Sequence, residues 1–106
     1  MKDLRILILD DEERVREEID EFLCGNKYTV FKAELPSKAF DILKNQTVDI
    51  AIVDIKLPEM DGISVLKKIK EGYPEIEVIM ISGHGDMNIV IEAMRLGASD
   101  YFPKPF

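Results

Sequence analysis

The chain has 106 residues, of which 46% are hydrophobic and 33% charged, so we expect one globular domain, residues 1–106, with a single core. With 14 basic against 21 acidic residues and a net charge of −7, its surface repels nucleic acid phosphates, which argues against direct DNA binding. No apolar run approaches the roughly 20 residues of a membrane-spanning helix. There is no signal-peptide pattern, and the single cysteine, Cys24, cannot form an internal disulfide, so a cytoplasmic protein is expected.

Strand and helix patterns alternate through the first half of the chain. An apolar run at residues 4–9 predicts a strand, which stops at the acidic pair Asp10-Asp11. A helix should follow, because apolar residues recur there with helical spacing: Val15, Ile19, Phe22 and Leu23. Residues 28–31 are β-branched and aromatic, which favours a second strand. A second helix is predicted from Pro36 to about Asn45.

The third predicted strand ends in an unexplained acid. Residues 50–53 are Ile-Ala-Ile-Val, a run typical of a strand that is buried on both faces, and Asp54 follows directly. A carboxylate at the mouth of a loop contributes nothing to a hydrophobic core. We therefore interpret Asp54 as a functional residue rather than a structural one.

The second half of the chain continues the alternation and ends in another short strand. Residues 62–72 predict a third helix, before which Asp61 is a turn residue or a helix cap. Residues 76–81 predict a fourth strand that ends in Ser82. Asp86 can cap a fourth helix that carries Ile89, Val90, Ala93 and Met94 and closes at Gly97. Residues 99–102 form the last predicted strand, and Lys104 comes after it.

Alternating strands and helices of this kind imply right-handed βαβ units. They predict an α/β fold, a doubly wound five-stranded parallel sheet with helices on both faces. Ligands bind such sheets in the crevice beyond the carboxyl ends of the strands. The polar residues that end or follow the predicted strands should therefore converge at one edge: Asp10, Asp11, Asp54, Ser82 and Lys104.

This convergence indicates phosphoryl transfer to a carboxylate. Three clustered acids repel one another unless a cation lies among them, and oxygen ligands favour Mg²⁺. Lys104 and Ser82 can then contact two oxygens of a phosphoryl group, while a carboxylate acts as the in-line nucleophile.

The whole chain resembles the receiver domain of a two-component response regulator. The matching residues are the pair Asp10-Asp11, Asp54 in Asp-Ile-Lys-Leu-Pro-Glu-Met-Asp-Gly, Ser82, Tyr101, and Lys104 in Lys-Pro-Phe. The resemblance implies the flavodoxin-like strand order 2-1-3-4-5 of the chemotaxis regulators.

The resemblance also implies a role for each matching residue. Asp54 would accept a phosphoryl group from a sensor histidine kinase, with Mg²⁺ held by Asp10, Asp11, Asp54 and the backbone carbonyl of Lys56. Lys104 would pair with the phosphoryl group. Ser82 and Tyr101 would form a switch that reshapes the face of the fourth helix and fifth strand, and so controls an output partner or a C-terminal output domain. Phosphorylation from small donors and slow autodephosphorylation are expected, rather than enzymatic turnover.

The chain departs from the family pattern at its end, where a fifth helix usually follows the Lys-Pro motif. The sequence stops at Phe106, and without that helix part of one sheet face should be bare. We therefore expect either that this form self-associates or that it is a fragment of a longer protein.

Other interpretations of these residues remain open. Asp54, Asp10 or Asp11 can cap a turn or helix, Ser82 can be a turn residue, Lys104 a surface lysine, and Tyr101 a packing residue. An Asp-nucleophile phosphohydrolase uses a similar site, but it carries a second acid two residues after the nucleophile, where this chain has Lys56. A third possibility is an interaction module on the same fold that is not phosphorylated.

Overall fold

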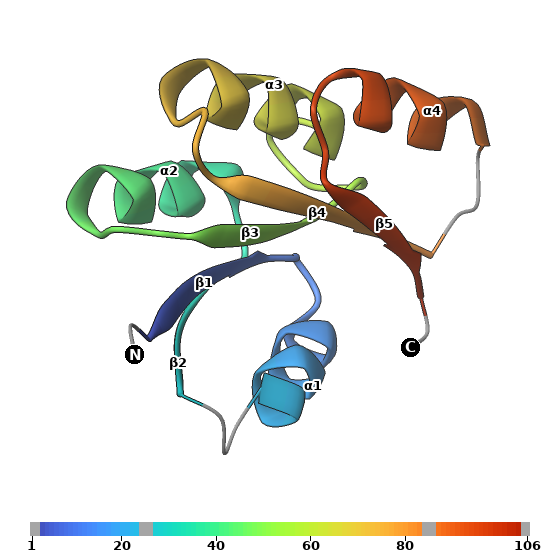
Figure 1. Ribbon diagram of the computed structural model, residues 1–106. Coiled ribbons are helices and arrows are strands. Elements are labelled where there is room, and N and C mark those ends of the chain that lie inside the picture. The colour runs from blue at the N-terminus through green and yellow to red at the C-terminus, as the bar shows by residue number, and fades with distance from the viewer. Residues whose placement is uncertain (1–2, 24–26, 84–86, 105–106) are drawn as a thin grey trace.

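The computed structural model describes residues 3–23, 27–83 and 87–104 and contains the predicted five-stranded sheet (Figure 1). All paired strands are parallel, in the order β2-β1-β3-β4-β5, so the predicted strand order 2-1-3-4-5 is confirmed. Cys24 and the predicted cap Asp86 lie outside the described residues. No described helix is long and apolar enough to cross a bilayer.

The elements follow one another almost where the sequence pattern placed them. Their bounds are β1 Leu4–Leu9, α1 Glu13–Leu23, β2 Tyr28–Ala33, α2 Pro36–Asn45, β3 Ile50–Asp54, α3 Gly62–Gly72, β4 Glu77–Ser82, α4 Met87–Arg95 and β5 Asp100–Pro103. Strand β2 is longer than predicted, because all six of its residues pair with β1. Ser82 is the last residue of β4, as predicted.

Helices α2, α3 and α4 cover one face of the sheet, and α1 lies against the other (Figure 1). Side chains alternate between faces along a strand, so every second strand residue points toward the three helices. On that side the strands contribute fully buried residues to one continuous core: Leu7, Leu9, Ala51, Val53, Val78 and Met80. The three-helix side is therefore closed.

The α1 side is covered less completely. On this side of the sheet, Ile6 and Ile8 of β1 are buried. Ile52 of β3 and Ile79 of β4 are only half-buried. Phe102 of β5 is 47% exposed. The expected bare region of this face is thus present among the described residues, while self-association through it stays a prediction.

Two residues assigned to apolar helix faces are not buried. Phe22 of α1 is 83% exposed, and Met94 of α4 is 44% exposed. A helical stripe predicts burial only where another element covers it, and α1 reaches the sheet mainly through Val15, its only buried residue. The prediction that Phe22 belongs to the apolar stripe of α1 that faces the sheet was wrong.

Backbone hydrogen bonds hold the segments that leave the carboxyl ends of the strands. The amide of Ile55 donates to the carbonyl of Ile81 (3.0 Å), and the amide of Lys104 donates to the carbonyl of Ser82 (2.8 Å). The ladder thus continues past the ends of β3 and β5, so the residues there are fixed relative to one another.

Candidate functional site

Asp54 ends β3 at the carboxyl edge of the sheet, where it is 5% exposed. Its strand is buried because β1 and β4 flank it on both sides. Asp10 follows β1 at the same edge and is fully buried. Two carboxylates are therefore held side by side, out of water, by two adjacent strands.

Lys104 lies between these two acids. Its Nζ is 2.7 Å from Oδ2 of Asp10 and 3.3 Å from Oδ2 of Asp54, and its side chain is 14% exposed. It reaches them from the segment after β5, two strands away from β3. Lys104 is therefore not a solvated surface lysine but part of the site.

Burial and neighbouring charges shift the pKa values of Asp54 and Lys104. Burial and the negative charge of Asp10 raise the pKa of Asp54, against the lowering effects of Lys104 and of the Lys56 amide. Burial lowers the pKa of Lys104, but the carboxylates of Asp10 and Asp54 outweigh it, so that its pKa is raised. The lysine stays positive while Asp54 is costly to ionise.

Asp11 completes a set of three acids at this edge. It is exposed, in contrast to Asp10 and Asp54, and one oxygen of each acid lies within 4.8 Å of the others. The backbone amide of Lys56 donates to Oδ1 of Asp54 at 3.4 Å. Three clustered carboxylate oxygens fit a hard divalent cation such as Mg²⁺. The ligand role of the Lys56 carbonyl stays a prediction.

A cavity of about 750 Å³ opens beside the acids. Asp11, Lys56 and Ser82 are among the residues that line it, together with the loop between β3 and α3 and residues of α3 and α4. Since Asp11 is exposed here, the cavity gives a reactant a route to the carboxyl edge.

Ser82 and Tyr101 lie on neighbouring strands. Ser82 is 2% exposed at the end of β4, and Tyr101 of β5 pairs with Met80. The ring of Tyr101 packs against the core, and its hydroxyl oxygen is buried without a hydrogen-bond partner among the described residues. The structure thus brings the aromatic residue inward; its coupling to Ser82 stays a prediction.

Three further contacts at this edge escaped the sequence analysis. Arg16 of α1 donates to the carbonyl of Asp10 at 2.7 Å. Glu59 accepts two hydrogen bonds from Ser37. A Cβ on Gly62 would lie 2.2 Å from the carbonyl oxygen of Asp54, so only glycine fits there. Of these three features, only the glycine has a signal in the sequence, the pair Asp61-Gly62 at the start of α3. Asp61 caps that helix, because its side chain accepts a hydrogen bond from the amide of Ser64.

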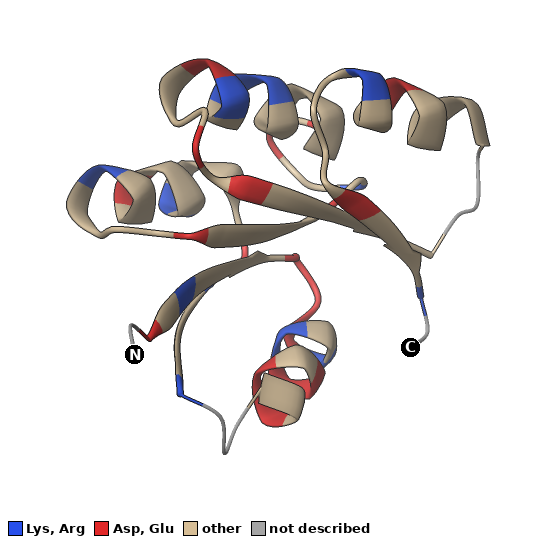
Figure 2. Cartoon of the chain, viewed as in Figure 1, with Lys and Arg blue, Asp and Glu red and all other residues tan. Residues whose placement is uncertain are grey.

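Acidic residues also mark the region around the site. Figure 2 shows acids in the segment after β1 and along α1. Among the three acids and Lys104 themselves, three carboxylates face one ammonium group. The site thus carries surplus negative charge, which a bound cation would offset.

Residues 6–106 match the response regulator receiver domain family. The chain belongs to this family. The receiver domain is 35% identical over 106 residues to sporulation initiation phosphotransferase F of Bacillus subtilis, covering all of this chain and 86% of that protein. The predicted family and fold are therefore confirmed.

Longer regulators contain a similar domain. The receiver domain is 42% identical over 108 residues to an NtrX-like response regulator of Rickettsia typhi, covering all of this chain but 23% of that protein. It covers 22% of the DNA-binding transcriptional regulator NtrC of Escherichia coli. The chain thus spans between a fifth and a quarter of the length of these two relatives.

Solved structures agree with the fold. The signal receiver domain of an HD domain-containing protein from Pseudomonas fluorescens superposes with a TM-score of 0.95 at 28% identity, over 99% of this chain and 85% of that one. The NtrX structure from Brucella abortus matches with a TM-score of 0.92 at 32% identity, over 99% of this chain and 24% of that one.

Proposed function

We propose that this receiver domain accepts a phosphoryl group on Asp54 from the phosphohistidine of a sensor histidine kinase. One observation carries the proposal: Asp54 is a buried carboxylate that faces Lys104 at 3.3 Å within a cluster of three acids. A structural cap would need neither the lysine nor the other acids. Phosphoryl transfer uses both.

The transfer exchanges one bond to phosphorus for another. An oxygen of the Asp54 carboxylate attacks phosphorus in line with the leaving group, and the P–N bond to the donor imidazole breaks. The bond's electron pair goes to the imidazole nitrogen. The product is an acyl phosphate on Asp54, which water later hydrolyses.

Asp10, Asp11, Asp54 and the Lys56 carbonyl would hold Mg²⁺. The ion would supply positive charge that lets the phosphoryl group approach three carboxylates. Because the pKa of Asp54 is raised by burial and by Asp10, its ionised form, which is the nucleophile, gains from any nearby positive charge. The fully buried Asp10 and the exposed Asp11 would approach the ion from the inner and outer sides of the site.

Lys104 and Ser82 would hold the transferred group. The ammonium of Lys104 already lies at the Asp54 carboxylate, so after transfer it would pair with a phosphoryl oxygen. The Ser82 hydroxyl, from the end of the adjacent strand β4, would donate to another.

The bound phosphoryl group would change the face formed by α4 and β5. Movement of Ser82 toward the phosphate and further inward packing of Tyr101 would shift α4 against β5. That face presents apolar side chains of α4 to solvent, because Met87 is 66% and Ile91 44% exposed. An output partner or a further domain would bind there according to the phosphorylation state. We place this signalling in the cytoplasm, where sensor kinases present their phosphohistidine.

A phosphohydrolase at this site is less well supported. Such an enzyme needs a second acid two residues after its nucleophile, and that residue here is the exposed Lys56. We therefore expect slow loss of the phosphoryl group rather than turnover.

Incubation with acetyl phosphate and Mg²⁺, followed by intact-mass measurement, tests the proposal. The expected result is a gain of one phosphoryl group that is absent in Asp54→Asn and when Mg²⁺ is left out. A protein that stays unmodified would refute the acceptor function. Sustained release of phosphate from many phosphoesters would instead support the hydrolase.

A further inference from the structure

Glu59 has a backbone conformation that its side chain disfavours. Its φ is +68°, and it is the one non-glycine residue with positive φ in the described part of the chain. Residues with a Cβ rarely adopt this conformation unless surrounding contacts hold it. Glu59 lies in the loop between Asp54 and α3, five residues after the proposed acceptor.

The contact that holds Glu59 is made with α2. Its Oε1 accepts from the backbone amide of Ser37 at 2.9 Å, and its Oε2 is 3.1 Å from the Ser37 hydroxyl, which donates to it. Helix α2 has no cap of its own, since Leu35 precedes it and Pro36 lacks an N–H group. The carboxylate of Glu59 therefore caps a helix that lies 22 residues earlier in the chain, where negative charge is favoured.

Two backbone hydrogen bonds constrain the loop that carries Glu59, one between its two ends and one in a turn within it. The amide of Gly62 donates to the carbonyl of Ile55 at 2.7 Å, and the amide of Met60 donates to the carbonyl of Pro58 at 2.8 Å. Gly62 also lies directly against the carbonyl of Asp54, where a Cβ would be only 2.2 Å away. Because of these contacts, we expect a displacement of the Glu59 backbone to displace the backbone of Asp54 and Lys56 as well.

We propose that Glu59 is a positioning residue: its contact with Ser37 fixes the acceptor loop, and through it the Lys56 backbone, in the geometry that binds the cation. This inference rests on the proposed function, because it assigns the loop a role in the same site. Glu59 is not one of the three clustered acids and would act through the loop. By reciprocity, cation binding at the acids strengthens the contact between Glu59 and Ser37.

The test separates loop positioning from stability. Glu59→Ala removes the acceptor but keeps a Cβ at positive φ, whereas Glu59→Gly removes the acceptor and relieves the conformation. We expect both to weaken Mg²⁺ binding, measured by calorimetry, and to slow labelling by acetyl phosphate, by about fivefold, the upper range for an exposed charged contact. Stability against urea should be higher for Glu59→Gly than for Glu59→Ala.

Three further variants complete the series. Glu59→Gln keeps an oxygen for the Ser37 amide and should recover part of the loss. Ser37→Ala should weaken Mg²⁺ binding without adding to the effect of Glu59→Ala in the double variant. Glu71→Ala removes an exposed acid of α3 and should leave Mg²⁺ binding and labelling unchanged.

Amide hydrogen exchange at Ser37 gives a readout that a purely structural cap would not move. In the unchanged protein, Mg²⁺ should slow exchange of this amide, and in Glu59→Ala it should not. If Glu59→Ala and Glu59→Gly bind Mg²⁺ and label as the unchanged protein does, the positioning role is wrong while the acceptor function stands. If the unchanged protein neither binds Mg²⁺ nor labels, the acceptor function itself fails, and the positioning role with it.

Discussion

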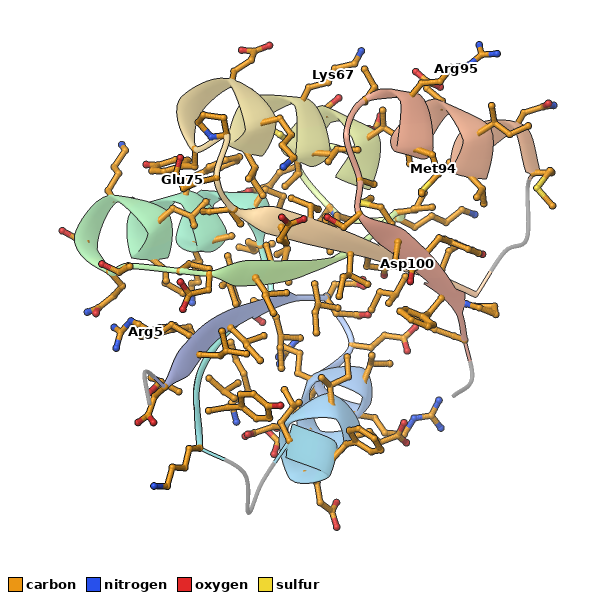
Figure 3. The ribbon with its side chains drawn as sticks, in the orientation of Figure 1. Arg5, Lys67, Glu75, Met94, Arg95 and Asp100 are labelled. Atoms are coloured by element: carbon orange, nitrogen blue, oxygen red, sulfur yellow. The ribbon has the colours of Figure 1, made fainter. Side chains whose placement is uncertain are left out.

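Strand β3 has an aspartate at each end, and the two differ in what surrounds them. Asp49 precedes the strand at the amino edge of the sheet, where its Oδ2 accepts from the amide of Arg5 at 2.9 Å. The Arg5 guanidinium donates to the carbonyl of Thr47 and to the side chain of Gln46, and it stacks over the Phe31 ring at 5.0 Å. Figure 3 shows Arg5 on β1 at this edge. At this edge of the sheet, the donors of Arg5 are paired with the acceptors of Asp49, Thr47 and Gln46.

Asp54, at the other end of the strand, is surrounded by unbalanced charge. It shares the ammonium of Lys104 with Asp10, and Asp11 lies within reach of both acids. Burial and Asp10 raise the pKa of Asp54, a cost that a purely structural site avoids. The two aspartates thus differ in their surroundings: Asp49 accepts a hydrogen bond in a structural contact, whereas Asp54 lies in a cluster with surplus negative charge that favours binding of a cation.

The largest expected effect concerns these two aspartates. Asp54→Asn should abolish labelling by acetyl phosphate, because an amide is no nucleophile toward phosphorus at this site. Asp49→Asn should label at the rate of the unchanged protein and lose about 1 kcal/mol of stability from the weakened contact with Arg5. Intact mass and urea titration measure both. Loss of labelling in Asp49→Asn with the fold intact would remove the distinction between the two ends of the strand.

Removing Lys104 should produce the next largest effect. Lys104→Ala takes away the charge that faces both buried acids, and we expect labelling to slow by about a hundredfold, as when one charge-stabilising donor is lost. Lys68→Ala, which removes an exposed lysine of α3, serves as the control. Equal rates for the two variants would show that Lys104 has only a structural role.

Ser82→Ala should separate acceptance of the group from the response to it. The variant keeps the nucleophile, the acids and Lys104, so it should still label, more slowly by about tenfold for one lost hydrogen bond to a charged group. The change in the NMR signals of Tyr101 on phosphorylation should then shrink. A full Tyr101 response in Ser82→Ala would disprove the coupling between the two residues.

The smallest expected effect is on stability as a function of pH, in the presence of EDTA. Because the pKa of Asp54 is raised in the folded state, the folded protein binds the proton more tightly than the unfolded chain, and stability falls as the pH rises through the folded pKa. Asparagine does not titrate, so Asp54→Asn does not lose stability in this way, and at pH 7 it should be more stable than the unchanged protein by about 1 kcal/mol. The difference should vanish below about pH 4, the unfolded pKa of aspartate. A difference that is constant between pH 4 and pH 7 would contradict the raised pKa.

The fold and most of the site were predictable from the sequence because they depend on local patterns and one topological rule. Alternating strands and helices determine a parallel sheet, and a parallel sheet brings Asp10, Asp54, Ser82 and Lys104 to one edge. Lys104 contacts both acids through its side chain, and its amide donates to the carbonyl of Ser82, so these four residues meet at one edge of the sheet.

The missed features depend on contacts between distant segments. The cap that Glu59 gives to α2 has no signature in either segment, since each alone looks like an ordinary turn and an ordinary helix start. The exposure of Phe22 likewise depends on which element lies opposite α1. Periodicity identifies the apolar side of a helix and not whether anything covers it.

Trapping the acyl phosphate tests the central claim most directly. Borohydride reduces an aspartyl phosphate to homoserine, so the protein labelled by acetyl phosphate and Mg²⁺ would be reduced, digested and sequenced by mass spectrometry. We predict homoserine at position 54 and at no other aspartate, with none in the sample that received EDTA before labelling. Homoserine at Asp10, Asp11 or Asp49, or a stable phosphoryl group on Ser82, would contradict the assignment of Asp54 as the acceptor.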